Sequence, residues 1–484
     1  MSILRAEKLQ TLDSSVTLSI ADLDETLTAL GLSVAEAISR LANSSISVKE
    51  LGATGDGVTD DTAAIVSAAT QYRDLFFPLG HYIVTGQIQC QPNCRISGSG
   101  MSGATGTRIQ RKGNWIGDTF RVGTADGTVA ALACRFTDFL VEQLHPGFDI
   151  STSVTMVDRL TDGQAHIRIF GGYACFVDRV WLQHAPYGVV LVGCTQPEIG
   201  IIKSYGSWDN KNAAISEQIA AVWVGDNQAI SAHRFNTQVK LGNIYVGVGG
   251  PSPTRTITVG SGSFAGYENI GARYGVLVTG AEGISISGYA GGAGQDCIAF
   301  IPSGLVTNVR IDDIFLDECF GALIHTYPAA NAVIGMTLGA NVQCNGQLQA
   351  RNCLRIEDNA GSPTLFGLSI EGGIYSNTLE TAFFLAGLAS ANIAPGLVNN
   401  YNGRGGGTGN VAISTGAYVT GSSNDIHFDG GLYGGGANTW SASNNCQYGP
   451  YVETAGKATA ANVRSKLGLA GGATVGGISQ TYPT

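Results

Sequence analysis

The sequence predicts an all-β fold, a single-stranded parallel β-helix, from three observations. One strand pattern recurs along the chain, and each copy is followed by a Gly-, Asn-, Ser- or Pro-rich turn and then by an alternating strand such as NVRID at 308–312. The copies that start at 274, 296 and 320 are 22 and 24 residues apart, about the length of one solenoid turn whose rungs stack ~4.8 Å apart. The recurring strands are YGVVLV (187–192), YGVLVT (274–279), DCIAFI (296–301), FGALIH (320–325) and NCLRIE (352–357).

Composition agrees with a repeat architecture. The chain has 484 residues, more than one ordinary core accommodates, with 68 Gly, 44% hydrophobic residues and only 13% charged residues. This balance excludes a disordered chain and indicates extensive buried surface. The rival folds are a β-sandwich and a propeller. The repeat of this sequence is a single strand unit and not a fourfold one, which argues against both.

Charge and hydropathy exclude two classes of partner. The net charge is −10 and no Lys/Arg-rich run occurs, so we expect no nucleic-acid binding. No window approaches eighteen uninterrupted apolar residues and no signal peptide precedes the fold, so we expect synthesis in a cytoplasm and no insertion into a membrane.

The ten cysteines are expected to be buried thiols, because a long chain made in a reducing compartment does not depend on disulfides. Cys297, Cys319 and Cys344 recur near the rung spacing, which indicates an inward-facing stack of small residues. Cys90 and Cys94 lack a second Cys/His pair of matching spacing, so no metal is assigned. No phosphate-binding loop or nucleophile elbow is present either, and no cofactor is expected.

An N-terminal stem is predicted at residues 19–44, after an attachment segment at 1–18. Apolar residues from Ile20 to Leu41 follow a 3-4 heptad alternation over three heptads. Gly31 interrupts this pattern, so two short helices and one kinked helix are both compatible with it. Either form would act as an oligomerisation element.

The solenoid is expected to span residues 45–450, and its opening carries a family resemblance. The run VKELGATGDGVTDDTAAI at 48–65 closely resembles the entry of pectate-lyase-like right-handed parallel β-helices, particularly those of phage tailspike depolymerases. The resemblance implies a helix that covers the first rung and a homotrimeric assembly. Asp56, Asp60 and Asp61 are interpreted as capping and turn residues and not as catalytic groups.

The C-terminal tail is predicted at residues 451–484. Within it, KATAANVRSKLGL at 457–469 reads as a short amphipathic helix that ends at glycines, and it resembles tail segments of phage fibre proteins. We expect this tail to help interlock the oligomer.

Candidate catalytic residues come from the repeat register. Glycoside hydrolysis requires two carboxyl groups on one surface, and Asp296 and Asp317 are 21 residues apart, close to one turn, with Glu318 adjacent. GQDCIA at 294–299 also resembles the Gly-Asp-Asp-Cys-Ile-Ala segment of polygalacturonases, which implies a general-acid role for Asp296. Gln295 replaces the first aspartate of that motif, and its following Gly-His-Gly is absent, so pectin hydrolysis itself is not implied. The competing interpretation is that Asp317 and Glu318 only solvate a corner.

Four further residues complete the predicted site. His325 and Glu357 lie five residues into successive strands, where a stacked His–carboxylate pair could act in acid–base chemistry or form a satisfied surface pair. We predict Glu357 as catalytic and His325 as substrate-binding, together with Tyr274 in the column of Asp296. Trp208, in the long insertion after 192, could supply an aromatic platform for a sugar or could pack that loop.

The function expected from these features is that of a phage tailspike that binds and depolymerises a bacterial surface polysaccharide (capsule, O-antigen or exopolysaccharide) by carboxylate-based glycoside hydrolysis. Its other expected partners are two further copies in a homotrimer and a virion tail or baseplate protein at the N-terminus, which places it in the virion. The alternatives are a polysaccharide lyase of the same fold and a receptor-binding spike without catalysis.

Overall fold

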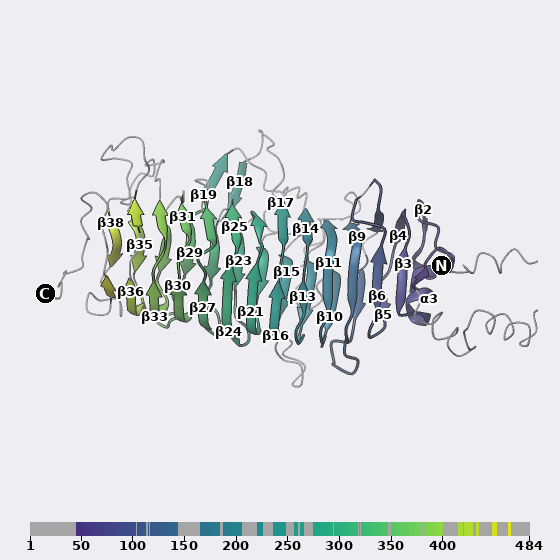
Figure 1. The fold of residues 1–484 in the computed structure, drawn as a ribbon, viewed down its shortest axis with the longest axis horizontal. Coiled ribbons are helices and arrows are strands. Elements are labelled where there is room, and N and C mark those ends of the chain that lie inside the picture. The colour runs from purple at the N-terminus through teal and green to yellow at the C-terminus, as the bar shows by residue number, and fades with distance from the viewer. Residues whose placement is uncertain are drawn as a thin grey trace, which may run out of the picture. The chain divides into compact units, whose positions relative to one another are not determined.

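The computed structural model describes a solenoid of parallel strands that runs from Ile46 to Ser465 (Figure 1). The described residues are 45–102, 104–112, 115, 117–143, 165–183, 187–205, 220–225, 236–247, 256–259, 262–265, 274–293, 295–317, 319, 321–346, 350–376, 378, 381–399, 415–419, 421–428, 432–434, 448–452 and 463–465. The predicted attachment segment and stem, at 1–18 and 19–44, therefore lie outside the described residues.

Twelve of the described strands form the first sheet, in which each strand pairs in parallel with the strand that the following rung contributes to the same sheet. Its members are β5 (Ile88–Cys90), β8 (Phe120–Val122), β10 (Ala165–Phe170), β12 (Tyr187–Val192), β15 (Ala220–Gly225), β20 (Tyr274–Val278), β23 (Asp296–Phe300), β26 (Ala322–Thr326), β29 (Asn352–Ile356), β32 (Phe383–Leu385), β35 (Thr415–Val419) and β38 (Tyr448–Val452).

The second sheet collects 25 further strands of the described chain. Its members are β1 (Ile46–Ser47), β2 (Asp56–Asp60), β3 (Asp74–Phe77), β4 (Gly80–Val84), β6 (Arg95–Gly98), β7 (Thr107–Arg111), β9 (Arg135–Gln143), β11 (Phe176–Gln183), β13 (Glu198–Ile199), β14 (Ile202–Tyr205), β16 (Asn236–Leu241), β17 (Ile244–Gly247), β21 (Ala281–Ser287), β22 (Ala290–Gly291), β24 (Val306–Asp312), β25 (Ile314–Asp317), β27 (Val333–Leu338), β28 (Val342–Asn345), β30 (Leu365–Ile370), β31 (Ile374–Ser376), β33 (Leu388–Ile393), β34 (Leu397–Asn399), β36 (Asn424–Phe428), β37 (Leu432–Gly434) and β39 (Val463–Ser465). An antiparallel hairpin, β18 (Thr256–Val259) with β19 (Gly262–Ala265), stands apart from both sheets.

Each rung in the middle of the solenoid contributes one strand to the first sheet and two to the second, as β23, β24 and β25 do. The predicted right-handed single-stranded parallel β-helix is thus confirmed. The recurring strands and their alternating partners were predicted correctly. The third strand of each rung was missed, because two to four residues carry too little pattern to detect. Trp223, which falls in the long insertion after residue 192, lies in β15, an additional rung.

A column of left-handed backbone positions runs along the second sheet, and the register aligns its members on seven strands from β16 to β36. In most of these strands the preceding residue is at least partly exposed and the following residue is buried, as Phe366 and Leu368 are on either side of Gly367. Several members are short polar residues or glycine, which reach positive φ at the lowest cost. This αL column comprises Gln238 (φ 54°), Gly283 (74°), Asn308 (54°), Gly335 (75°), Gly367 (74°), Ser390 (59°) and Asp425 (53°).

The one described α-helix, α3 (Thr62–Gln71), packs Ile65, Ala68 and Ala69 inward at the N-terminal end of the stack (Figure 1). The predicted turn roles of the nearby aspartates are confirmed, but the N-cap residue of the helix makes no side-chain capping hydrogen bond. Asp60 accepts the Thr62 N–H at 3.0 Å. Asp61 is the N-cap residue, but its buried carboxylate instead accepts the backbone N–H groups of residues 54 and 55. Asp56 accepts N–H groups within its own turn.

The core contains thiols as predicted. The nine cysteines among the described residues are free and buried. Burial raises the pKa of Cys319 and Cys344, and neighbouring thiols raise it further, so the stack predicted from Cys297, Cys319 and Cys344 lies inside the solenoid.

The C-terminal prediction is corrected in one place. Val463–Ser465, inside the segment expected to form a helix, forms β39 and pairs in parallel with β36. An isolated short helix is marginally stable, whereas the last strand of a stack presents unpaired N–H and C=O groups that a following segment can satisfy. Within the described residues, no helix has both the length and the apolar character needed to cross a bilayer.

Candidate active site

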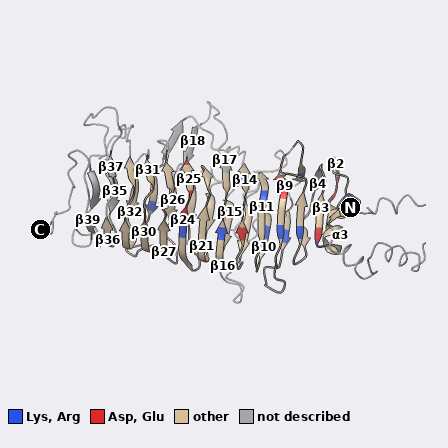
Figure 2. Cartoon of the chain, viewed as in Figure 1, with Lys and Arg blue, Asp and Glu red and all other residues tan. Residues whose placement is uncertain are grey.

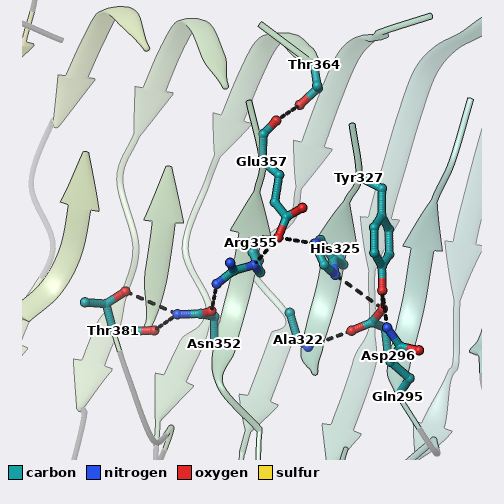
Figure 3. Close-up of polar contacts among 10 residues, drawn as sticks. All are labelled: Gln295, Asp296, Ala322, His325, Tyr327, Asn352, Arg355, Glu357, Thr364 and Thr381. Atoms are coloured by element: carbon teal, nitrogen blue, oxygen red, sulfur yellow. Dashed lines mark hydrogen bonds and ion pairs between the residues drawn. The ribbon is translucent and has the colours of Figure 1, made fainter. Parts of the chain in front are cut away.

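A cluster of polar side chains occupies the first sheet at β23, β26 and β29 (Figure 3). It consists of Asp296, His325, Tyr327, Arg355 and Glu357 and is called here the His325 cluster. The parallel register aligns Ala299, His325 and Arg355 on successive strands. These side chains therefore lie on one face of neighbouring rungs.

Asp296 is fully buried and its carboxylate accepts hydrogen bonds from three groups. The Ala322 N–H donates to Oδ1 at 2.7 Å, the Tyr327 hydroxyl donates to Oδ2 at 2.5 Å, and His325 Nδ1 lies 3.3 Å from Oδ2. A Cβ at Gly321 would lie 2.1 Å from Oδ1, so only glycine leaves room for this arrangement. Asp296 is thus a buried acceptor that orients the groups around it.

His325 is held between two carboxylates. Its ring stacks on that of Tyr327, with 3.7 Å between centroids, and only 5% of the residue is exposed. Nδ1 faces Asp296, and Nε2 lies 3.6 Å from Oε1 of Glu357. Burial alone lowers the pKa of His325, but the negative charges and hydrogen bonds of Asp296 and Glu357 outweigh it and the pKa is raised. The imidazolium form is therefore favoured.

Glu357 is the more accessible carboxylate of the cluster, with 28% of its side chain exposed. The adjacent His325 holds the pKa of Glu357 at about 2, and burial, which acts in the opposite direction, is further offset by Arg355. Arg355 Nε donates to Oε1 at 2.7 Å. The guanidinium is itself fixed by Asn352 Oδ1 at 3.2 Å and lies over the Phe384 ring at 4.3 Å.

The arrangement places a bound proton beside an ionised carboxylate. The raised pKa of His325 favours its protonated form, and Glu357 presents an ionised carboxylate at its exposed edge. Burial raises the pKa of Tyr327, so its hydroxyl stays protonated and continues to donate to Asp296. An acid paired with a base at one surface is the arrangement that general acid–base catalysis requires. No group of three or more His, Cys, Asp or Glu side chains within the described part of the chain is arranged to hold a metal ion.

The pKa values predict how stability depends on pH. The pKa of Glu357 is about 2 in the folded chain and 4.5 in an ordinary glutamate. The pairing of its carboxylate therefore stabilises the fold by about 3 kcal/mol, and this contribution is complete above pH 4.5. This contribution is lost as the pH falls from 4.5 towards 2. The contribution of His325, whose pKa is raised from 6.5, is complete below 6.5 and is lost as the pH rises through the raised value.

We therefore expect Glu357→Gln to flatten the acid limb of a plot of unfolding free energy against pH. Urea unfolding of the wild-type chain and the variant between pH 2 and 5 measures this. Parallel acid limbs for the two proteins would contradict the assigned pairing.

The other residues predicted from sequence are placed as follows. Asp317 ends β25 in the second sheet, in register with Asn345. Its backbone carbonyl lies 3.6 Å from the Sγ of Cys297, the residue after Asp296, but Asp317 and Asp296 belong to different sheets. Glu318 and Trp208 lie outside the described residues.

Tyr274 is in register with Asp296, as predicted, but is only 2% exposed. It packs edge-on against Tyr327, with 6.3 Å between ring centroids, and belongs to an apolar cluster on the same face. It therefore supports the His325 cluster and is not an exposed sugar platform.

The predicted pairing of His325 with Glu357 brings these side chains together, with a difference in register. His325 pairs with Arg355, and Glu357 lies two residues further on the same face. Arg355 and Tyr327 were missed by sequence reasoning. The available signal was alternation, because Tyr327 follows His325 by two residues and Arg355 precedes Glu357 by two.

Comparisons with known proteins agree with the fold. A family model described as rhamnogalacturonase A/epimerase, pectate lyase-like, matches residues 45–157. The opening of the solenoid is pectate-lyase-like. A glucan 1,3-beta-glucosidase of Cochliobolus carbonum is 46% identical over 69 residues, which are 13% of this chain, and the chain spans only 9% of that relative's length. The family match ends well before the strands that carry the His325 cluster.

Two solved structures have similar backbones. The surface protein and adhesin PfbA of Streptococcus pneumoniae matches with a TM-score of 0.51 at 12% identity, over 90% of this chain and 100% of that one. DFA-IIIase from Arthrobacter chlorophenolicus A6 matches with a TM-score of 0.52 at 12% identity, over 79% and 94% of the two chains. At this identity the likeness concerns the fold alone, and activity has to be argued from the site.

Proposed function

We propose that this chain binds and depolymerises a bacterial surface polysaccharide by glycoside hydrolysis, and that it does so as a phage tailspike. The observation that carries the catalytic part is the His325 cluster, in which a proton-bearing imidazole faces an ionised, partly exposed carboxylate at 3.6 Å. The tailspike part rests on the resemblance of residues 48–65. Its homotrimer and its virion partner are proposals of the same kind.

In the proposed reaction His325 donates its Nε2 proton to the glycosidic oxygen as the bond to the anomeric carbon breaks. Glu357 attacks the anomeric carbon directly and is released by water afterwards, because its 3.6 Å separation from His325 Nε2 leaves no room for an attacking water between the two groups. Asp296 accepts from Nδ1 and keeps Nε2 directed towards Glu357, at whose exposed edge the sugar would bind. The general-acid role expected for Asp296 is assigned in this proposal to His325, because the Asp296 carboxylate is fully buried and has three partners, whereas His325 lies next to the exposed edge of Glu357.

Support for a carbohydrate substrate comes from the similarity to the Cochliobolus carbonum relative, a glucan 1,3-beta-glucosidase, and from the pectate-lyase-like opening. Arg355 favours a second candidate, a polysaccharide lyase, because a guanidinium 2.7 Å from Glu357 could neutralise a uronate while a neutral His325 removed a proton.

The low exposure of His325, 5%, favours a third candidate, a receptor-binding spike without catalysis.

One assay separates these candidates. Purified surface polysaccharides from susceptible bacteria are incubated with the chain, and reducing ends and ultraviolet absorbance are followed together. We expect reducing ends to form without a rise in absorbance. A rise from unsaturated products would identify a lyase, and polysaccharide that is bound but unchanged would leave the binding spike.

A further inference from the structure

A second surface feature lies away from the His325 cluster, on the second sheet. It is a groove of about 680 Å³ across β27, β30, β33 and β36, called here the second-sheet groove. These four strands follow one another in the stack, each from a successive rung (Figure 1). The residues that line it are Gly335, Met336, Thr337, Gly367, Leu368, Ser369, Ser390, Ala391, Asn392, Asn424, Asp425, Ile426 and His427.

Three parallel rows of residues build the groove. Its floor is the αL column, where glycine at two successive rungs leaves the space above the backbone open. One side is a polar row that the register aligns across the four rungs: Thr337, Ser369, Asn392 and His427. On the other side Asn424 lines the groove, and the register continues its row beyond the lining through Ala389 to two exposed apolar side chains, Phe366 at 41% and Ile334 at 49%. Phe366 and Ile334 directly precede Gly367 and Gly335 of the floor, so they flank the groove.

The groove is nearly uncharged. β27, β30 and β33 contain no Lys, Arg, Asp or Glu, and Figure 2 draws these strands in tan. Asp425 is the one charged residue of the lining, and Ser390 Oγ donates to it at 3.2 Å. A phosphate polymer needs cations that this lining lacks. A peptide that adds as a strand needs a sheet edge, and the groove lies over strands that are paired on both sides.

A sugar chain fits both sides of this groove. A pyranose ring presents an apolar C–H face, which can lie on Phe366 and Ile334, and a rim of hydroxyl groups, which can bond to the amide and hydroxyl row opposite. Equivalent groups recur from rung to rung every ~4.8 Å, close to the length of one sugar unit. An extended glycan lying along the stack would therefore meet the same pair of surfaces repeatedly.

We infer that the second-sheet groove is a non-catalytic binding site for an extended, uncharged segment of polysaccharide. It lies on a different sheet from the His325 cluster, so it holds a polymer independently of cleavage. The choice of a glycan shares its ligand class with the proposed function, but it rests on the groove's own lining and requires no catalysis.

The test is affinity electrophoresis of the full chain through gels that contain O-antigen polysaccharides, dextran or laminarin. Phe366→Ala removes the aromatic surface, and Asn392→Ala removes a hydrogen-bonding group from the opposite side. Phe315→Ala is the matched control, because Phe315 is similarly exposed, at 42%, but lies on β25, which contributes no residue to the groove. We expect Phe366→Ala to weaken retardation by at least about tenfold, equivalent to about 1.4 kcal/mol, and Phe315→Ala to change it by no more than about twofold.

Three outcomes would overturn the inference. The first is that Phe366→Ala and Phe315→Ala have equal effects. The second is that no uncharged polysaccharide retards the wild-type chain. The third is that sedimentation velocity traces the effect of Phe366→Ala to altered self-association. Thermal unfolding of each variant verifies folding, and Asn392→Ala keeps the test valid if Phe366→Ala fails to fold. If no polysaccharide is cleaved but Phe366-dependent binding persists, only the proposed function fails.

Discussion

Glu357→Gln is expected to lower the rate of polysaccharide cleavage by about 10²–10⁴-fold while leaving the solenoid folded. The amide keeps the shape of the side chain and can still meet Arg355, but it cannot act as a base or a nucleophile. The measurement is the initial rate of reducing-end formation on a polysaccharide that the wild-type chain cleaves. Circular dichroism and thermal unfolding establish that the variant is folded.

Asp317→Asn is the matched comparison for this variant. The sequence pairs Asp317 with Asp296, whereas the structure places its side chain on the second sheet, in register with Asn345. We expect Asp317→Asn to retain near-wild-type activity. A loss as large as that of Glu357→Gln would contradict the assignment of catalysis to the His325 cluster, and so would a fully active Glu357→Gln enzyme.

Asp296→Ala is expected to destabilise the fold by about 3–5 kcal/mol, the usual cost of removing one partner from a buried ion pair. The change leaves the Ala322 N–H and the Tyr327 hydroxyl without their acceptor and leaves a buried imidazolium with one carboxylate in place of two. Urea unfolding measures the loss. A variant as stable as the wild-type chain would contradict the described role of Asp296.

Asp296→Asn separates positioning from stability. The amide oxygen can still accept from Ala322, so we expect a folded protein, but the charge that raises the pKa of His325 is gone. The basic limb of the pH–rate profile should therefore move to lower pH, along with a large loss of rate. A purely structural role for Asp296 would leave the position of that limb unchanged.

Much of the fold could be predicted because a solenoid repeats its pattern. Strands such as those at 274 and 296 share an apolar signature, and their separation equals one turn. The short third strands could not be predicted, because strands such as Ile374–Ser376 depend on stacking against their neighbours and not on their own sequence. β39 could not be predicted for the same reason, because its pairing with β36 outweighs the helical pattern of its sequence.

The candidate site could be predicted only in part. The proximity of His325 and Glu357 could be predicted, because it follows from the repeat spacing, which places both residues at the same position of successive strands. The burial of Asp296 could not be inferred, because all five positions of β23 are buried in the folded chain, whereas the pattern predicts one solvated face. Its role depends on Tyr327 and Gly321, which reach it only once the next rung is stacked.

Rungs of this solenoid are interchangeable units. Because the described rungs from β16 to β36 each pass once through the αL column, residues such as Asn308, Gly335 and Gly367 mark equivalent points of successive turns. A crossover between two such points would add or delete one whole turn, and the flanking strands would keep their inward and outward faces. Descendants of this chain can therefore lengthen or shorten in steps of ~4.8 Å, which would adjust the span of a bound polymer without redesigning any single contact.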